Sequence, residues 1–182
     1  MPKSLIINRA DQAPGQHWQE INGQIQIVDG RRPAAHEIFD SCTDTGALKS
    51  WTWYTTKTCQ PTIKSQISHC VADGAWEAHT ANVLETSDLV EAYVKNERLG
   101  FHIHYLWNGA RRRYVPDFLI RLRNGKMMIL EIKGQDSPQN KQKRQALAAW
   151  VEAVNQKGGF GVWCWDVAFE MGKIQDLLRR AC

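Results

Sequence analysis

The 182-residue chain has no apolar run approaching 18 residues, so no segment is long enough to cross a membrane as a helix. Its N-terminus also lacks the basic and then apolar pattern of a signal peptide. The five cysteines include no CxxC pair, and an odd number is not typical of a secreted disulfide framework. We therefore expect a cytoplasmic protein whose thiols are reduced.

Several catalytic classes have no counterpart in the sequence. It contains no Walker-type glycine-rich phosphate loop, so we expect that the chain does not bind ATP. It has neither a Ser/His/Asp arrangement nor a cysteine and histidine spacing typical of zinc sites. His102 and His104 share one strand face, but such a pair without a third ligand is more often structural.

Positive charge is concentrated in one part of the chain. The net charge is +4, but residues 98–144 hold 11 lysines and arginines against three acids, a net charge of +8, so the rest carries −4. This distribution suits a polyphosphate partner. Any single basic residue is as typical of a solvated surface as of a phosphate contact. The candidate nucleic-acid contacts are Arg111, Arg112, Arg113, Lys141, Lys143 and Arg144.

Two neighbouring apolar segments carry charged residues at a suggestive spacing. Asp117 follows Pro116 at the start of one segment, and Glu131 and Lys133 lie two residues apart on the next. Residues two apart on a strand point to the same face, so Glu131 and Lys133 project together. Buried charge without a partner is costly. A strand that keeps such groups therefore indicates a chemical role.

The apolar residues of the two segments predict how the strands pair. Each segment carries an alternating apolar stripe, at 118, 120 and 122 in the first and at 128, 130 and 132 in the second. Burying the stripes together pairs residue 118 with residue 132, which brings Asp117 opposite Lys133 and Leu119 opposite Glu131. A two-residue Asn124-Gly125 turn does not allow this register. We therefore expect a loop of odd length or a bulge.

The two carboxylates predict a metal site. Asp117 and Glu131 offer hard oxygen ligands, which suit Mg²⁺ or Mn²⁺ better than zinc. Such an ion lowers the pKa of a coordinated water and neutralises phosphate charge. Lys133 beside it would orient or help deprotonate the attacking water, or stabilise charge that develops on the phosphate. Together these groups indicate hydrolysis of a phosphodiester.

The set Pro116-Asp117, Glu131 and Lys133 resembles the signature of the PD-(D/E)xK nuclease superfamily. The resemblance implies an α/β fold with a restriction-endonuclease-like αβββαβ core, in which helices flank a mixed central sheet. It also implies that the main-chain carbonyl of Ile132 binds metal. Many members add a glutamate on the helix before the first core strand. Glu77 stands at that position, although an exposed helix glutamate is an equally good interpretation.

The order of several further motifs is similar to the C-terminal endonuclease domain of type III restriction enzyme Res subunits. The similarity covers roughly residues 51–178, and His104 stands where that family would have proline. It implies cleavage of double-stranded DNA, coupled to a helicase motor and a methyltransferase on other chains. The motifs are Trp76-Glu77, Val94-Lys95-Asn96, Tyr114-Val115-Pro116-Asp117-Phe118, Glu131-Ile132-Lys133-Gly134 and Gly161-Val162-Trp163.

Hydrophobic periodicity gives the expected arrangement of the elements. We expect an N-terminal extension or small subdomain over residues 1–70, with a hairpin near 24–28 and strand material at 51–54. The endonuclease domain follows over residues 71–182. Its expected elements are helices over 74–85 and 87–96, a strand over 101–107, the two motif strands, a helix over 138–156, a strand over 160–167, and a last helix with Ile174, Leu177 and Leu178 on one face.

Two alternatives to a nuclease for double-stranded DNA stay open. One is a nuclease of the same superfamily that cuts branched DNA or RNA. The other is a non-catalytic DNA-binding module that retains the fold. The complete Asp117, Glu131 and Lys133 set favours an enzyme over the second alternative.

Overall fold

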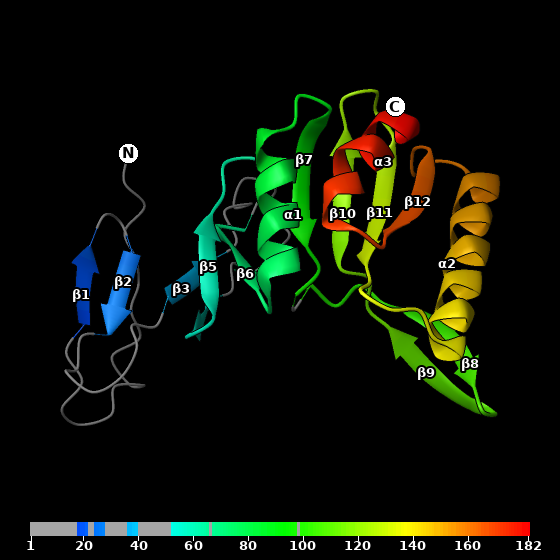
Figure 1. Ribbon diagram of the computed structural model, residues 1–182, viewed down its shortest axis with the longest axis horizontal. Coiled ribbons are helices and arrows are strands. Elements are labelled where there is room, and N and C mark those ends of the chain that lie inside the picture. Colours follow the sequence, from blue (N-terminus) through cyan, green and yellow to red (C-terminus); the bar gives the residue numbers. More distant parts are fainter. Residues whose placement is uncertain (1–17, 22–23, 28–35, 40–51, 66, 98) are drawn as a thin grey trace.

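The computed structural model describes residues 18–21, 24–27, 36–39, 52–65, 67–97 and 99–182 (Figure 1). In this part of the chain, a mixed β-sheet and three α-helices make an α/β fold. None of the described helices is long and apolar enough to cross a membrane.

Four strands form the central sheet, in the order β12-β11-β10-β7. They are β7 (Val90–Lys95), β10 (Phe118–Leu122), β11 (Met127–Ile132) and β12 (Trp163–Ala168). β10 runs antiparallel to both β7 and β11, whereas β12 runs parallel to β11. The parallel pair requires a crossover connection, which α2 provides.

One face of the sheet packs against α1 (Ala75–Thr86) and α3 (Ile174–Ala181), which lie in front of the sheet in Figure 1. A short 3₁₀ turn, Met171–Lys173, leads into α3. Every second residue of β10 and β11 points to this face. These side chains are buried in the core: Phe118, Ile120, Leu122, Met128 and Leu130. The expected face of the last helix is confirmed, because Ile174, Leu177 and Leu178 are all buried in this core.

The other face packs against α2 (Pro138–Lys157). The Ser137 side chain accepts a hydrogen bond of 3.1 Å from the Asn140 N–H, which caps the helix as expected before a first-turn proline. Gly158, with a φ of 67°, ends the helix. Leu147 and Val151 of α2 are buried against Ile129 of β11.

Within the described residues, four antiparallel strand pairs precede the central sheet or interrupt it. β1 (Trp18–Ile21) pairs with β2 (Gln24–Ile27), close to the hairpin expected from the sequence, and β3 (His36–Phe39) pairs with β4 (Thr52–Thr55). β5 (Thr58–Pro61) pairs with β6 (His69–Ala72), so this hairpin spans the expected boundary between residues 70 and 71. The division into two domains stays a prediction.

The fourth pair is a hairpin that lies between β7 and β10 in the chain. β8 (Ile103–Trp107) and β9 (Ala110–Tyr114) form a separate two-stranded sheet. Asn108 and Gly109 connect them with φ angles of 50° and 72°, as a tight hairpin turn of this sequence requires. In Figure 1 the hairpin extends beyond the end of α2, away from the central sheet.

The predicted helix over 87–96 is wrong, because this segment contains β7. Ser87 ends α1 instead of starting a second helix, and its N–H donates to the Val83 carbonyl at 2.9 Å. Val90 and Tyr93 are buried on the sheet, and β7 pairs with β10 over its whole length. Pairing with a distant strand overrides the local helix signal. Between α1 and α2 the central sheet takes the strands β7, β10 and β11, with β8 and β9 inserted between β7 and β10, and β12 follows α2.

The register of the two motif strands differs from the expected one by two residues. Phe118 pairs with Leu130, not with Ile132. The loop has odd length as expected, because the Leu122 N–H donates to the Lys126 carbonyl at 2.9 Å across three intervening residues. Gly125, with a φ of 84°, allows this shorter loop. A shift of two residues keeps both apolar stripes on the core face but changes the partner of Asp117.

Candidate active site

The observed register brings the two predicted carboxylates next to each other. Phe118 pairs with Leu130, so Asp117 and Glu131, the residues next to this pair, lie close together at the ends of the two strands. The N–H of Ile132 donates to Asp117 Oδ2 at 2.7 Å, which fixes the Asp117 side chain against β11. Glu131 is only 3% exposed. The sequence predicted that these residues lie on one face, but it placed Lys133 opposite Asp117.

Both oxygens of Glu131 have a protein partner. Lys133 Nζ lies 2.6 Å from Oε1, and the hydroxyl of Tyr114 donates to Oε2, also at 2.6 Å. Tyr114 is 2% exposed and stands at the end of β9. Burial and then the adjacent Glu131 raise the pKa of Tyr114 far above its ordinary value, so it remains a hydrogen-bond donor at neutral pH.

Tyr114 is a site residue that sequence reasoning missed as such. The motif comparison included it, but gave it no role. A signal does exist in the sequence, because Tyr114 is an aromatic residue that directly follows three consecutive arginines. Such a residue points inward.

Asp117 titrates at an unusual pH. Burial, followed by the charge of Glu131, raises the pKa of Asp117 from 3.8 to about 7, although the Ile132 N–H and Lys133 act in the opposite direction. Among the residues that the structure describes, none donates a hydrogen bond to its second oxygen, Oδ1. The carboxylate pair therefore carries more negative charge than its protein neighbours compensate, and one oxygen stays available to a further ligand.

Lys133 is a cation at neutral pH. Burial lowers the pKa of Lys133, but the charge and hydrogen bond of Glu131 outweigh burial and raise it above 10.5. A lysine that is already protonated cannot take a proton from water. Of the roles that the sequence left open, this geometry favours orientation of water or stabilisation of phosphate charge.

The chemistry of these donors fits a hard divalent cation. The site offers carboxylate oxygens, and the Ile132 main chain adjoins them, because its N–H contacts Asp117. Within the described ranges, no three His, Cys, Asp or Glu side chains are grouped so that they could hold a metal ion. The expected donor set contains only two such side chains, Asp117 and Glu131. The metal site stays a prediction.

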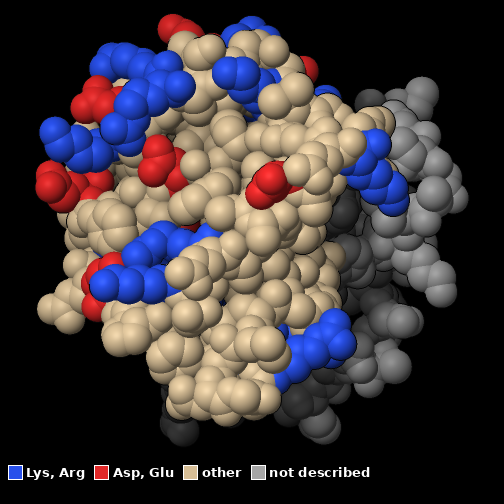
Figure 2. Space-filling model, turned by 90° about the vertical axis from the view of Figure 1, so that its right-hand side faces the viewer, with Lys and Arg blue, Asp and Glu red and all other residues tan. Residues whose placement is uncertain are grey.

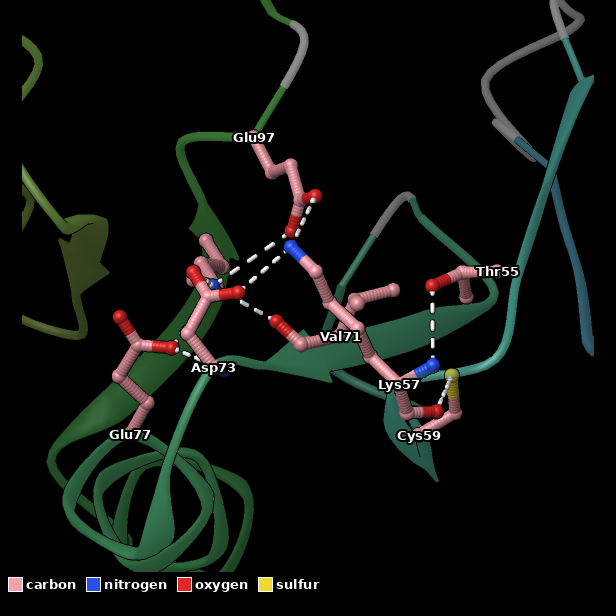
Figure 3. Close-up of polar contacts among 8 residues, drawn as sticks. Thr55, Lys57, Cys59, Val71, Asp73, Glu77 and Glu97 are labelled. Atoms are coloured by element: carbon pink, nitrogen blue, oxygen red, sulfur yellow. Dashed lines mark hydrogen bonds and ion pairs between the residues drawn. The ribbon is translucent and has the colours of Figure 1, made fainter.

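Glu77 points into a different ion-pair cluster, seen in Figure 3. Its Oε2 lies 2.7 Å from Lys95 Nζ and accepts a hydrogen bond of 2.6 Å from the Asp73 N–H. Lys95 Nζ also lies 3.1 Å from Asp73 Oδ2 and 3.5 Å from Glu97 Oε2, and its side chain is 9% exposed. Lys57, which lies between β4 and β5, forms ion pairs with both Asp73 and Glu97.

The cluster nevertheless adjoins the carboxylate pair. The charge of Glu77 contributes to the raised pKa of Asp117, as the smallest of its causes. Hydrogen bonds to Glu77 and Asp73 outweigh burial and raise the pKa of Lys95, so the cluster keeps its cation. The structure therefore places Glu77 near the site with its carboxylate directed to Lys95. Its predicted part in catalysis stays untested.

Two of the predicted basic residues of α2 lie near Glu131. Lys143 and Arg144 line a small cavity together with Tyr114, Glu131 and Lys133. Lys143 Nζ lies 5.7 Å from the centre of the Tyr114 ring. Arg144 forms a bidentate pair with Asp136, at 2.7 and 2.8 Å, so a phosphate would have to share or replace this partner. Lys141 is exposed one turn earlier on the helix.

The predicted arginines of β9 are all exposed. Figure 2 shows the face that carries α2, where lysine and arginine side chains form several separate groups with uncharged surface between them. Acidic side chains lie beside some of these groups. The charge excess of residues 98–144 is therefore not spread as one continuous basic field over this face.

Comparisons of the chain with protein-family models, with curated proteins and with solved structures give no match. The functional argument therefore rests on the sequence motif and on the geometry of the site.

Proposed function

We propose that this chain is a Mg²⁺-dependent endonuclease domain that hydrolyses double-stranded DNA. The observation that carries the proposal is the closeness of two carboxylates, Asp117 just before β10 and Glu131 on β11, beside the cationic Lys133. A structural ion pair needs one acid for each base. The second, half-buried carboxylate has a strongly raised pKa, which is typical of groups kept for chemistry.

The arrangement of the elements supports a PD-(D/E)xK assignment. Helix α1, strands β7, β10 and β11, helix α2 and strand β12 follow the order that the resemblance implies for a restriction-endonuclease-like core. The two carboxylates lie on its second and third strands. We further propose that the domain corresponds to the nuclease part of a type III restriction Res subunit.

Each residue of the candidate site has a separate proposed role. Asp117, Glu131 and the Ile132 carbonyl would hold Mg²⁺, or Mn²⁺ in its place. The bound ion would supply charge neutralisation and a more acidic water. Tyr114 fixes the orientation of Glu131 through its hydrogen bond. Lys133 places a positive charge beside the carboxylates, where a phosphate oxygen gains charge during hydrolysis.

The proposal includes partners on other chains. A type III system needs an ATP-driven motor and a methyltransferase that reads the recognition site. The present sequence has no Walker-type loop, so the motor must come from another polypeptide or segment. Activity of the isolated chain is therefore expected to be low.

Cleavage of supercoiled plasmid tests the proposal. The wild-type chain should nick plasmid with Mg²⁺ or Mn²⁺ but not with EDTA, and Asp117→Asn should abolish nicking. Asp176→Asn on α3, whose partner is the exposed Arg179, is the matched control and should cut like the wild type. Equal nicking by wild type and Asp117→Asn would refute the assignment.

The same assay separates the alternatives. If the chain cuts branched DNA or RNA faster than duplex DNA, it is a nuclease of the same superfamily that acts on another substrate. Binding of duplex DNA without cleavage, and with no response to metal, would indicate a non-catalytic module. Metal binding by calorimetry that is lost in Asp117→Asn would argue against that module even if cleavage were absent.

A further inference from the structure

The β8–β9 hairpin has one packed face and one outer face. Side chains alternate along a strand, and residues that lie opposite each other on paired strands share a face. On the packed face, Ile103, Tyr105 and Tyr114 are buried against α2 and β11. The outer face consists of two cross-strand pairs whose side chains are all exposed: His104 with Arg113, and Leu106 with Arg111.

This division separates three consecutive arginines that the sequence does not distinguish. Arg112 pairs with Tyr105, so it belongs to the packed face, although its own side chain is exposed. Arg111 and Arg113 belong to the outer face. The structure therefore divides the predicted nucleic-acid contacts of β9 into two that share a surface and one that does not.

The outer face carries positive charge without a compensating acid. Desolvation and then nearby charges, those of Arg111 and Arg113 included, lower the pKa of His104, whereas Arg112 does not contribute. Within the described ranges, neither outer-face arginine forms an ion pair. By contrast, the arginines of α2 and α3 each have an acidic partner, at 2.7 to 3.1 Å. Like charges that lie close together repel one another, so this face favours an anionic partner.

We propose that the outer face binds one sugar–phosphate backbone of duplex DNA beside the cleavage site, with Arg111 and Arg113 each contacting a phosphate. A single basic face meets a single backbone, because the opposite face of the hairpin is packed against α2. Phosphates of one DNA strand follow each other every ~3.4 Å along the axis, so two arginines about 6.6 Å apart on β9 reach the same backbone. Arginine binds phosphate bidentately, and such contacts carry no sequence information.

The outer face lies next to the candidate active site. Arg113 directly precedes Tyr114, whose hydroxyl donates to Glu131 at 2.6 Å. At ~3.3 Å per residue, Arg111 lies within roughly 10 Å of Tyr114 along the strand. Figure 1 shows the hairpin at the end of the sheet where β11 leads into α2, which is the end that carries Glu131. The proposed contact deepens the proposed function, and it rests on that function because its partner is duplex DNA.

Binding measured without cleavage tests the proposal. A short duplex is titrated in EDTA at several salt concentrations with wild type, with Arg111→Ala/Arg113→Ala and with the control Arg112→Ala/Arg123→Ala. Both pairs remove two exposed positive charges, and Arg112 lies on the same strand as the outer-face pair. Each phosphate contact contributes about 0.9 to the slope of log K against log salt. We expect the outer-face variant to lose about 1.8 from this slope and the control to lose nothing.

A conservative variant separates phosphate contact from altered structure. Arg111→Lys/Arg113→Lys keeps both charges and should keep the wild-type slope, because counterion release depends on charge. An unchanged slope in the outer-face alanine variant, or an equal loss in the two alanine pairs, would overturn the proposal. A lysine variant as impaired as the alanine variant would overturn it as well. Absence of plasmid cleavage with the expected binding results intact would instead overturn only the nuclease assignment.

Discussion

Replacing Asp117 by asparagine should make the metal-free protein more stable. Burial and the neighbouring Glu131 raise the pKa of Asp117 from 3.8 to about 7. Between these pH values the folded protein holds a proton that the unfolded chain has released. Stability therefore falls as pH rises from about 4 to about 7, and stays at the lower level above pH 7. Asparagine has no charge to lose, and its side-chain oxygen still accepts the Ile132 N–H.

The size of the effect follows from the same shift. A change of about three pKa units corresponds to ~4 kcal/mol at 1.36 kcal/mol per unit. This is an upper value, because Asp117 is only partly buried and solvent screens part of the interaction. We expect a gain of about 2–4 kcal/mol at pH 8, which for a chain of this length raises Tm by roughly 5–10 °C. At pH 4 the gain should nearly vanish.

Thermal unfolding in EDTA at pH 4 and pH 8 measures this effect. Asp136→Asn is the matched control with the opposite sign, because Arg144 holds the pKa of Asp136 at about 2. The stability from Asp136 is present above about pH 4 and is lost as pH falls toward 2, so its variant gains nothing at pH 8. A neutral or lower Tm for Asp117→Asn at pH 8, or an equal gain at both pH values, would refute the reasoning. Mg²⁺ should raise the Tm of the wild type but not that of Asp117→Asn.

The remaining predictions concern hydrogen bonds around the site. Tyr114→Phe removes a hydrogen-bond donor from the buried Glu131 carboxylate and should lower the free energy of unfolding in urea by about 1.5–3 kcal/mol. The control is Tyr105→Phe on the same hairpin, which loses only a neutral hydrogen bond from Gln139 and should cost about 0.5–1.5 kcal/mol. Equal losses would contradict a charged partner for Tyr114. Glu77→Gln weakens the ion pair with Lys95 and should cost about 1–3 kcal/mol, with metal affinity by calorimetry changed much less than in Asp117→Asn. A loss of metal affinity as large as that of Asp117→Asn would place Glu77 among the ligands.

The sequence predicted the elements whose signals are local. The Ser137 cap, the first-turn proline and Gly158 bound α2 within the sequence itself. Asn108-Gly109 likewise defines its hairpin turn without help from the rest of the chain. The register of β10 and β11 is less local, because the apolar stripes fit each other equally well after a shift of two residues. The length of the loop decides between these registers, and only the structure provides it.

The error at residues 87–96 has a different origin. Ser87 and Asp88 are typical of a helix start, but Ser87 lies where α1 ends. What makes the segment a strand is β10, which follows more than twenty residues later and pairs with β7 on the side away from β11. Non-local pairing of this kind leaves no strong pattern in the segment itself. The first strand of the expected core was therefore assigned to residues 101–107, a segment that contains β8 instead.

Tyr114 joins the β8–β9 hairpin to the candidate active site. It ends the strand that carries the exposed arginines, and its hydroxyl contacts Glu131. The β8–β9 hairpin cannot move relative to the central sheet without breaking or lengthening this buried hydrogen bond, since Tyr114 and Glu131 are both nearly inaccessible to water. An unbroken stretch of β9 thus connects three exposed arginines to the hydroxyl that orients the Glu131 carboxylate.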